Sequence, residues 1–418
     1  MPRVVFFIAL RQLWDRKLLN GIATLGVGLG VLVLIAISAI MSGFQVKFIN
    51  SILKISPHVT IFDKQLRPAP PLLARYTDDF IAARVSHEVP SDRQLRINRP
   101  EEIVRALEQL EGVLDAAASL NGSALVAFGS KQLPIDLRGI DPSRQDRVTP
   151  ISAYIQAGSF RTLDAAPDGV LIGTGLATRI GAKLDDVIVC GAPLGQQLSL
   201  KIVGIFESGI PSVDQNRVYV VLRNAQAILG KPDIVGRIDI KLRDPEVAVR
   251  VAARVEQMFG YDAESWQETN ANFLSLFTQQ NTIINFVVGA ILMVGGFGIL
   301  AIQIMIVLQK TRDIAILRSV GFHRSDILAA FLLQGAVIAL LGAALGSVGG
   351  HYIIVALSKL RTNTEGLVKS EYFLVYEDPL MYVYGTLFAL LVGLLASFIP
   401  AWRGSRVEPV DVLRGQLG

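Results

Sequence analysis

Four long stretches of the 418-residue chain are almost entirely apolar. A transmembrane helix needs about 20 such residues, and none of the four stretches carries Lys, Arg or Glu in its middle. The first is too long for the apolar part of a signal peptide, and no A-x-A-like cleavage site follows it. The pattern therefore predicts four retained transmembrane helices, at Gly21–Gly43, Ile283–Leu308, Ile327–Gly350 and Met381–Trp402.

Basic residues in the short flanking segments predict how the chain is oriented, because cytoplasmic loops carry an excess of them. They are Arg3, Arg11, Arg16, Lys17, Lys310, Arg312, Arg318, Arg324, Arg403, Arg406 and Arg414. With four spans these residues all fall on one side, which is predicted to be the cytoplasm. The expected organisation has cytoplasmic segments at 1–20, 309–326 and 403–418, a large outer domain at 44–282 and an outer loop at 351–380.

The outer segment mixes short strand-like runs with amphipathic helices, which predicts an α+β fold. Helices are expected from Pro100 to Gly112 and from Pro245 to about Phe259. Strands are expected at Pro57–Phe62, Ala124–Phe128, Val170–Ile172, Val187–Cys190, Leu198–Phe206, Val218–Leu222 and Ile238–Leu242. The polar, proline-bearing stretch 64–99 gives no clear pattern.

A further helix is expected to extend from the second span into the outer domain. Apolar residues lead without a break into that span, at Phe273, Leu274, Leu276 and Phe277. A continuous helix of this kind is a stiff connection between the bilayer and the outer domain.

Composition agrees with a membrane protein, since 51% of residues are hydrophobic, only 18% are charged and the mean hydropathy is +0.46. The net charge of +4 is small, and no basic stripe with interleaved aromatic residues occurs, so no nucleic-acid partner is expected. The lone cysteine, Cys190, lies in an apolar run and is interpreted as a packed thiol.

Motifs for catalysis are absent from the sequence. Without a G-x-x-x-x-G-K-[ST] phosphate loop, the chain is not expected to hydrolyse ATP. The four histidines are far apart with no H-E-x-x-H, no G-x-S-x-G occurs, and the span centres lack carboxylates. We therefore expect no catalytic residues, no metal and no directly bound cofactor, and another chain must supply energy for directed work.

Small residues recur at helical spacing within the spans. Gly26 and Gly30 are four residues apart, as are Gly342 and Gly346. Because small residues let helices approach closely in lipid, these glycines predict tight helix contacts. The contacts lie either inside one bundle or at the interface of a dimer.

A short amphipathic helix is expected between the second and third spans. Ile314, Leu317 and Val320 share one apolar face, and the charged residues Arg312, Asp313 and Arg318 flank it, while Gly321 is placed for a left-handed C-terminal cap. The helix is too short to span a membrane. It either lies in the lipid headgroups or docks into a cytoplasmic partner.

The residues Lys310–Gly321, K-x-R-D-I-A-I-L-R-S-V-G, followed by Gln334-Gly335, resemble the FtsX-like permease domain of the MacB, LolC/LolE and FtsX branches of ABC transporters. The closing residues 399–403 and the P-x-D-x-L-R at 409–414 are similar to the end of that domain. The outer elements Asp168–Leu184 and Val203–Phe206 with Asp214 are also similar to the family. The resemblance covers the chain except for about 64–99.

The resemblance implies a bacterial inner-membrane protein whose outer domain is of the MacB periplasmic-core type. It implies two permeases, either two copies or two paralogues, bound to two cytoplasmic ATPase subunits that hold ATP and Mg. Residues matching the coupling helix are Arg312, Asp313, Ile314, Leu317, Arg318, Val320 and Gly321. In this family, substrate is thought not to cross the bilayer, and motion passes outward to the periplasmic domains.

The branch is predicted from lengths. About 20 residues precede the first span, which favours a permease split from its ATPase, and an outer domain of about 240 residues is too large for the FtsX branch. LolC/LolE-like lipoprotein release fits best. LolC-like subunits hold a lipoprotein carrier on a long hairpin, but the matching region Gly191–Leu200 is short. The partner subunit of a heterodimer, a homodimer, an efflux permease with a periplasmic adaptor, and a regulator of cell-wall hydrolases remain alternatives.

Overall fold

The computed structural model describes residues 11, 17–63, 96–365 and 369–408, and the chain divides into two compact units. Unit 1 comprises Met1–Lys47, Ser275–Asn363 and Ser370–Gly418, and unit 2 comprises Phe48–Leu274 and Thr364–Lys369. The predictions for Arg3, Arg16, most of the stretch 64–99 and the closing motif at 409–414 lie outside the described residues.

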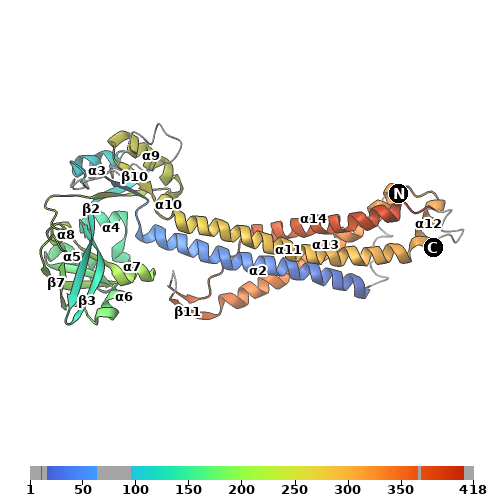
Figure 1. Cartoon of the computed structure of the whole chain (residues 1–418), viewed down its shortest axis with the longest axis horizontal. Coiled ribbons are helices and arrows are strands. Elements are labelled where there is room, and N and C mark those ends of the chain that lie inside the picture. The colour runs from blue at the N-terminus through green and yellow to red at the C-terminus, as the bar shows by residue number, and fades with distance from the viewer. Residues whose placement is uncertain (1–10, 12–16, 64–95, 366–368, 409–418) are drawn as a thin grey trace, which may run out of the picture. The chain divides into compact units, whose positions relative to one another are not determined.

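Unit 1 is built from long helices (Figure 1). In the described part of the chain, four helices are long and apolar enough to cross a membrane, which agrees with the four predicted spans. They are α2 (Lys17–Ile55), α11 (Ala271–Gln309), α13 (Arg324–Ser358) and α14 (Pro379–Ser405). A short helix, α12 (Thr311–Ser319), follows α11, and a two-stranded sheet of β11 (Arg361–Glu365) and β12 (Lys369–Tyr372) precedes α14.

The helices of unit 1 are apolar on both their inner and outer faces. Ile35 and Ile299 are fully buried in the bundle, whereas Leu25, Leu29 and Phe286 point outward and are 64%, 61% and 79% exposed. In water this exposed apolar surface would be unfavourable, but in a bilayer it faces lipid. The packing therefore agrees with a membrane-spanning bundle.

Helix α11 begins at Ala271 in unit 2 and continues through the predicted second span, so the expected extension of that helix is confirmed. Helix α2 likewise continues past its predicted end to Ile55. Within unit 1 the ring centroids of Phe44 and Phe277 are 5.9 Å apart, and within unit 2 those of Phe48 and Phe273 are 5.1 Å apart. The two helices therefore pack together in each unit.

Unit 2 contains a ten-stranded mixed sheet. Its strands are β1 (Val59–Phe62), β2 (Val113–Phe128), β3 (Lys131–Ile140), β4 (Ile155–Gly158), β5 (Gly169–Gly173), β6 (Val187–Gly191), β7 (Leu198–Phe206), β8 (Arg217–Val221), β9 (Arg237–Leu242) and β10 (Asp262–Ser265). The predicted strands are present, and β3, β4, β10 and the first half of β2 were not predicted.

Strand pairing closes part of this sheet into a ring that runs β2-β3-β8-β5-β7-β6 and returns to β2. Strands β9, β1 and β10 extend from the first half of β2. The ring surrounds the main hydrophobic core of unit 2, which includes Leu137, Ile172, Ile202 and Val218, all fully buried. Closure leaves no unpaired edge within the ring, although β10 and β4 remain at the ends of the whole sheet.

Short helices complete unit 2. They are α3 (Pro100–Glu108), α4 (Pro142–Val148), η2 (Ile151–Tyr154), α5 (Phe160–Ala165), α6 (Thr174–Ile180), α7 (Pro211–Asn216), α8 (Leu222–Leu229), η3 (Pro245–Val247), α9 (Ala248–Phe259) and α10 (Trp266–Thr269). The predicted helices at 100 and 245 are present. Cys190 is fully buried, and burial raises the pKa of its thiol to about 12, as expected for a packed cysteine.

Candidate functional site in the segment 310–323

The expected amphipathic helix is present as α12, and its end has the predicted cap. Gly321 has a φ of +106°, which glycine adopts without strain. The Phe322 amide donates to the Leu317 carbonyl at 3.2 Å, and the Gly321 amide donates to the Arg318 carbonyl at 3.2 Å. This pair of bonds is a Schellman motif, which fixes where the helix stops and how the chain turns into α13.

Ile314, Leu317 and Val320, which are predicted to share one apolar face, differ in exposure within this chain. Ile314 is only 2% exposed because it packs into the bundle core of unit 1, and Leu317 is half-buried against the same core. Val320 is 77% exposed and Ile316 is 47% exposed. The apolar surface available to a partner is therefore formed by Ile316 and Val320, and Ile314 anchors α12 to its own chain.

The charged residues of the segment also divide into two groups. Arg318 Nη1 donates to the carbonyls of Ser405 at 3.2 Å and Val407 at 3.0 Å, so this guanidinium caps the end of α14. Lys310 Nζ lies 3.0 Å from Asp313 Oδ2 in an exposed ion pair. Arg312 is exposed. Of the predicted contact residues, Arg312, Asp313 and Val320 are accessible in this structure, whereas Ile314 and Arg318 have clear internal packing roles.

The predicted glycines lie inside the bundle. A Cβ added at Gly346 would meet Gly28 O at 2.4 Å, and one at Gly342 would meet Thr24 O at 2.8 Å. A Cβ at Gly30 would meet Leu292 Cδ2 at 2.6 Å, and one at Gly26 would lie 3.9 Å from the Gly295 Cα. Of the two readings left open, these contacts favour packing within one bundle.

Two buried glutamines in the spans were not singled out as site residues. Gln303 Nε2 donates to Phe331 O at 3.2 Å and to Ser397 Oγ at 3.0 Å, so it joins α11, α13 and α14. Gln334 is fully buried, and its amide group has no hydrogen-bond partner among the described residues. The signal in the sequence is a glutamine inside an apolar run, where an amide requires a partner helix.

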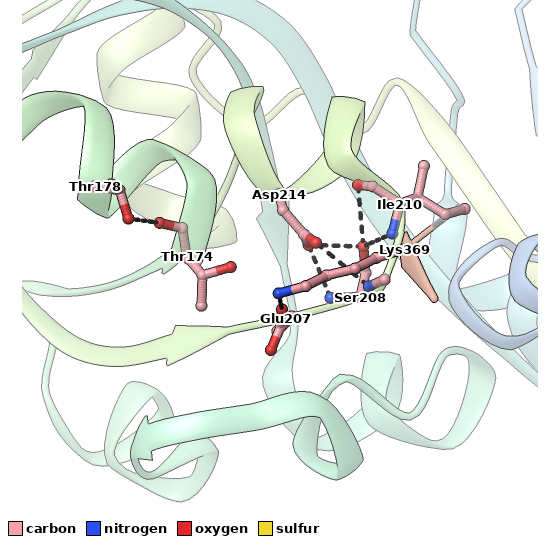
Figure 2. A network of polar contacts seen from close by, with 8 residues as sticks. Thr174, Thr178, Glu207, Ser208, Ile210, Asp214 and Lys369 are labelled. Carbon is pink, nitrogen blue, oxygen red and sulfur yellow. Dashed lines mark hydrogen bonds and ion pairs between the residues drawn. The ribbon is translucent and has the colours of Figure 1, made fainter. Parts of the chain in front are cut away.

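Asp214, which accompanies the family-like run Val203–Phe206 in the sequence, binds the turn that follows strand β7 (Figure 2). Asp214 accepts hydrogen bonds from the amide and hydroxyl of Ser208, both at 2.7 Å, and from the Gly209 amide at 3.3 Å. Burial raises the pKa of the Asp214 carboxyl. These bonds hold the 208–210 turn in one conformation.

The same turn binds a distant part of the chain. Lys369 Nζ lies 2.5 Å from Glu207 Oε1, and the Lys369 amide donates to the Gly209 carbonyl at 2.9 Å (Figure 2). Lys369 belongs to the expected outer loop 351–380, so this loop contributes a residue to unit 2. The sequence offered no signal for this contact, because the two partners are far apart in the chain.

The connection between β6 and β7 is short, as expected from the sequence. It covers 192–197 and packs onto α8, where the Gln196 amide donates to the Ala227 carbonyl at 3.0 Å. A long projecting hairpin is not present at this position.

Four bilayer-length helices, a large α+β domain between the first two and a capped amphipathic segment between the second and third define a polytopic membrane protein of the permease class. Two family models match the chain. The MacB-like periplasmic core domain matches residues 21–258, and the FtsX-like permease C-terminal domain matches residues 285–409. The chain belongs to this family of ABC transporter permeases, and its large domain is of the periplasmic type.

Transporter proteins of other bacteria are similar to most of the chain. LolC of Xylella fastidiosa (strain 9a5c), a lipoprotein-releasing system transmembrane protein, is 26% identical over 415 residues, which cover 93% of this chain and 92% of that protein. The macrolide export ATP-binding/permease protein MacB of Agrobacterium fabrum is 23% identical over 420 residues, which cover 96% of this chain and 59% of that protein. The solved periplasmic region of MacB from Actinobacillus actinomycetemcomitans matches 55% of this chain and 98% of that chain at 13% identity, with a TM-score of 0.35.

Proposed function

We propose that this chain is the permease subunit of an ATP-driven transporter that releases lipoproteins from the bacterial inner membrane. A separate cytoplasmic ATPase hydrolyses ATP, and a second permease copy or paralogue completes the transporter. The single observation that carries the proposal is the similarity to a lipoprotein-releasing LolC protein over nearly the full length of both chains. The lack of a phosphate-binding loop in the sequence supports an ATPase on another chain.

The 310–323 segment is the proposed docking point for the ATPase. Its helix is anchored by Ile314 and by the Schellman motif, which together hold the exposed Ile316 and Val320 in a fixed position. A rigid, partly apolar projection suits a socket in another protein better than a flexible loop does, because little conformational entropy is lost on binding. Motion of the ATPase would then reach α11 and α13 through the two ends of this segment.

The proposal is tested by replacing Val320 with aspartate. Since Val320 is 77% exposed, the bundle should fold normally. Burial of a valine stabilises a contact by about 1.5 kcal/mol, so its loss weakens association roughly tenfold, and a desolvated carboxylate weakens it further. We expect normal membrane abundance, loss of the co-purifying ATPase, and loss of lipoprotein release from proteoliposomes.

The matched control is Leu194→Asp, which changes a leucine that is 91% exposed in unit 2 and should leave the ATPase bound. If Val320→Asp retains both the ATPase and ATP-dependent release, the docking assignment is wrong. A helix that merely lies in the headgroups predicts that the variant loses membrane stability while any ATPase complex survives.

Efflux with a periplasmic adaptor is the second candidate, because the similarity to MacB covers 96% of this chain. The purified complex distinguishes the two. Acylated protein bound to the complex supports lipoprotein release. A bound adaptor without acylated protein, together with a change in drug sensitivity on deletion, supports efflux instead.

A further inference from the structure

Unit 2 contains a cavity of about 250 Å³, which lies apart from the 310–323 segment. One wall is apolar and comes from the last turns of α2 and the first turn of α11, with Phe48, Ile52 and Phe273. Trp266, which is 5% exposed, also lines the cavity. The opposite wall is the sheet, and it is polar.

The polar wall arises from the alternation of side chains along neighbouring strands. Asp136 on β3 pairs in register with Arg217 on β8, and Arg138 lies two residues further along β3. Because successive strand residues point to opposite faces, these three share one face of the sheet. Leu137 and Val218 point to the other face and are buried in the hydrophobic core. A strip of charge therefore faces the cavity.

Two arginines of this strip share a single carboxylate. Asp136 Oδ2 lies 3.5 Å from Arg138 Nε and 3.3 Å from Arg217 Nε. The Arg138 Nε atom is buried and has no hydrogen-bond partner in the described part of the chain. Burial, and then the charge of Arg217, lower the pKa of the Arg138 guanidinium. Two positive charges are thus held close together beside one shared carboxylate.

A third arginine, Arg237, also lines the cavity and forms no ion pair with the residues that the structure describes. Its guanidinium carbon lies 5.8 Å from the ring centroid of Phe62. Asp239 is the only carboxylate among the described lining residues, and it accepts hydrogen bonds from Ser119 and Gln145, both at 3.3 Å. Against Asp136 and Asp239, the three arginines leave one positive charge uncompensated.

We propose that this cavity binds the anionic head group of an amphiphile, with a phosphate or carboxylate held by the arginines of the polar wall. Partly buried positive charge is costly unless it is paired, and guanidinium groups bind phosphate and carboxylate in a bidentate manner. The apolar portion of the ligand lies against Phe48, Ile52 and Phe273. The volume fits a head group with a short apolar segment and is too small for a whole lipid.

Two sources offer this chemistry, a phospholipid with an anionic head group and a free fatty acid. The inference does not depend on the cargo or on an ATPase, so its failure and that of the proposed function are separable. The probes are octyl phosphate, which represents the phosphate source, and octanoate, which represents the carboxylate source. Inorganic phosphate tests the contribution of the apolar wall, and octyl phosphocholine, which has no net charge, tests the contribution of the arginines.

The measurement is a fluorescence titration of the full chain in phosphatidylcholine nanodiscs. Trp266 reports on the cavity after Trp14 and Trp402, the remaining tryptophans, are replaced with phenylalanine. We expect a saturable change with octyl phosphate or octanoate, with the tighter of the two identifying the source. The better probe should bind at least tenfold more tightly than inorganic phosphate and octyl phosphocholine.

Arg237→Gln should weaken binding of the better probe by about 10- to 100-fold, because it removes a charged hydrogen-bond donor without stranding a carboxylate. Arg250→Gln, at an exposed arginine of α9 outside the cavity, is the matched control and should bind normally. Should Arg237→Gln fold poorly, Phe273→Ala provides a second test, since it should weaken octyl phosphate but not inorganic phosphate. The proposal is overturned by equal affinity for octyl phosphocholine, by equal affinity for inorganic phosphate, or by variants that bind as the wild type does.

Discussion

Replacing Gly346 with alanine is expected to force α2 and α13 apart. A Cβ at Gly346 would lie 2.4 Å from Gly28 O and 2.8 Å from Val31 Cβ, so the helices must separate by about 1 Å to reach the 3.4 Å of ordinary contact. Overpacking of this kind costs about 1–3 kcal/mol. The ~1 kcal/mol that alanine gains over glycine in a helix offsets only part of this cost when the clash is severe. A Cβ at Gly26 would lie 3.9 Å from its nearest neighbour, the Gly295 Cα, so alanine would meet no clash there and would only gain in helix propensity.

The two variants form a matched pair, and unfolding by SDS in mixed micelles, followed by circular dichroism, measures the difference. Gly346→Ala should lower the free energy of unfolding of the bundle by up to about 2 kcal/mol, and Gly26→Ala should leave it unchanged or raise it slightly. The reasoning is refuted if both variants keep a stable bundle but lose association between copies. That result would place the glycines at a dimer interface.

Two other residues lead to further predictions. Burial, and then the charge of Lys241, lower the pKa of His58 from 6.5 to about 4, so only the unfolded chain takes up a proton between these values. Stability should therefore be full above pH 6.5 and fall by about 3 kcal/mol towards pH 4, and His58→Gln should flatten this dependence of the denaturation midpoint on pH. Arg318→Ala should increase hydrogen exchange at the end of α14, because two carbonyls lose a charged donor worth about 1.5–3 kcal/mol, whereas Arg312→Ala should not.

The membrane helices and several strands were predictable because their patterns are local. A long apolar run has few structural solutions, and β7 was predicted with the bounds that the structure gives. The first half of β2 was missed because it contains Asp115 and the alanines 116–118, and both residue types have weak strand propensity. It is a strand because β9 pairs with its first half and β3 with its second.

The site was only partly predictable, because periodicity identifies an apolar face without saying what covers it. Ile314 and Val320 lie at helical spacing in the sequence, yet one is buried by its own bundle and the other is exposed. The polar wall of the cavity had a local signal, since polar Asp136 and Arg138 alternate with apolar Ile135 and Leu137. The cluster of charge on this wall could not be predicted from one strand alone, because it depends on the register between strands, which brings Arg217 opposite Asp136.

The continuity of α2 and α11 across the boundary between the units constrains how the length of this protein can change. Each helix passes from one unit into the other with no loop at the boundary, between Lys47 and Phe48 in α2 and between Leu274 and Ser275 in α11. An α-helix turns by about 100° and rises by 1.5 Å per residue. One residue inserted into either helix would therefore turn the side chains that follow it in that helix by about 100° about the helix axis. A chimaera of two members of this family should therefore join its parents within α2 or α11 only where that helix has the same number of residues in both parents.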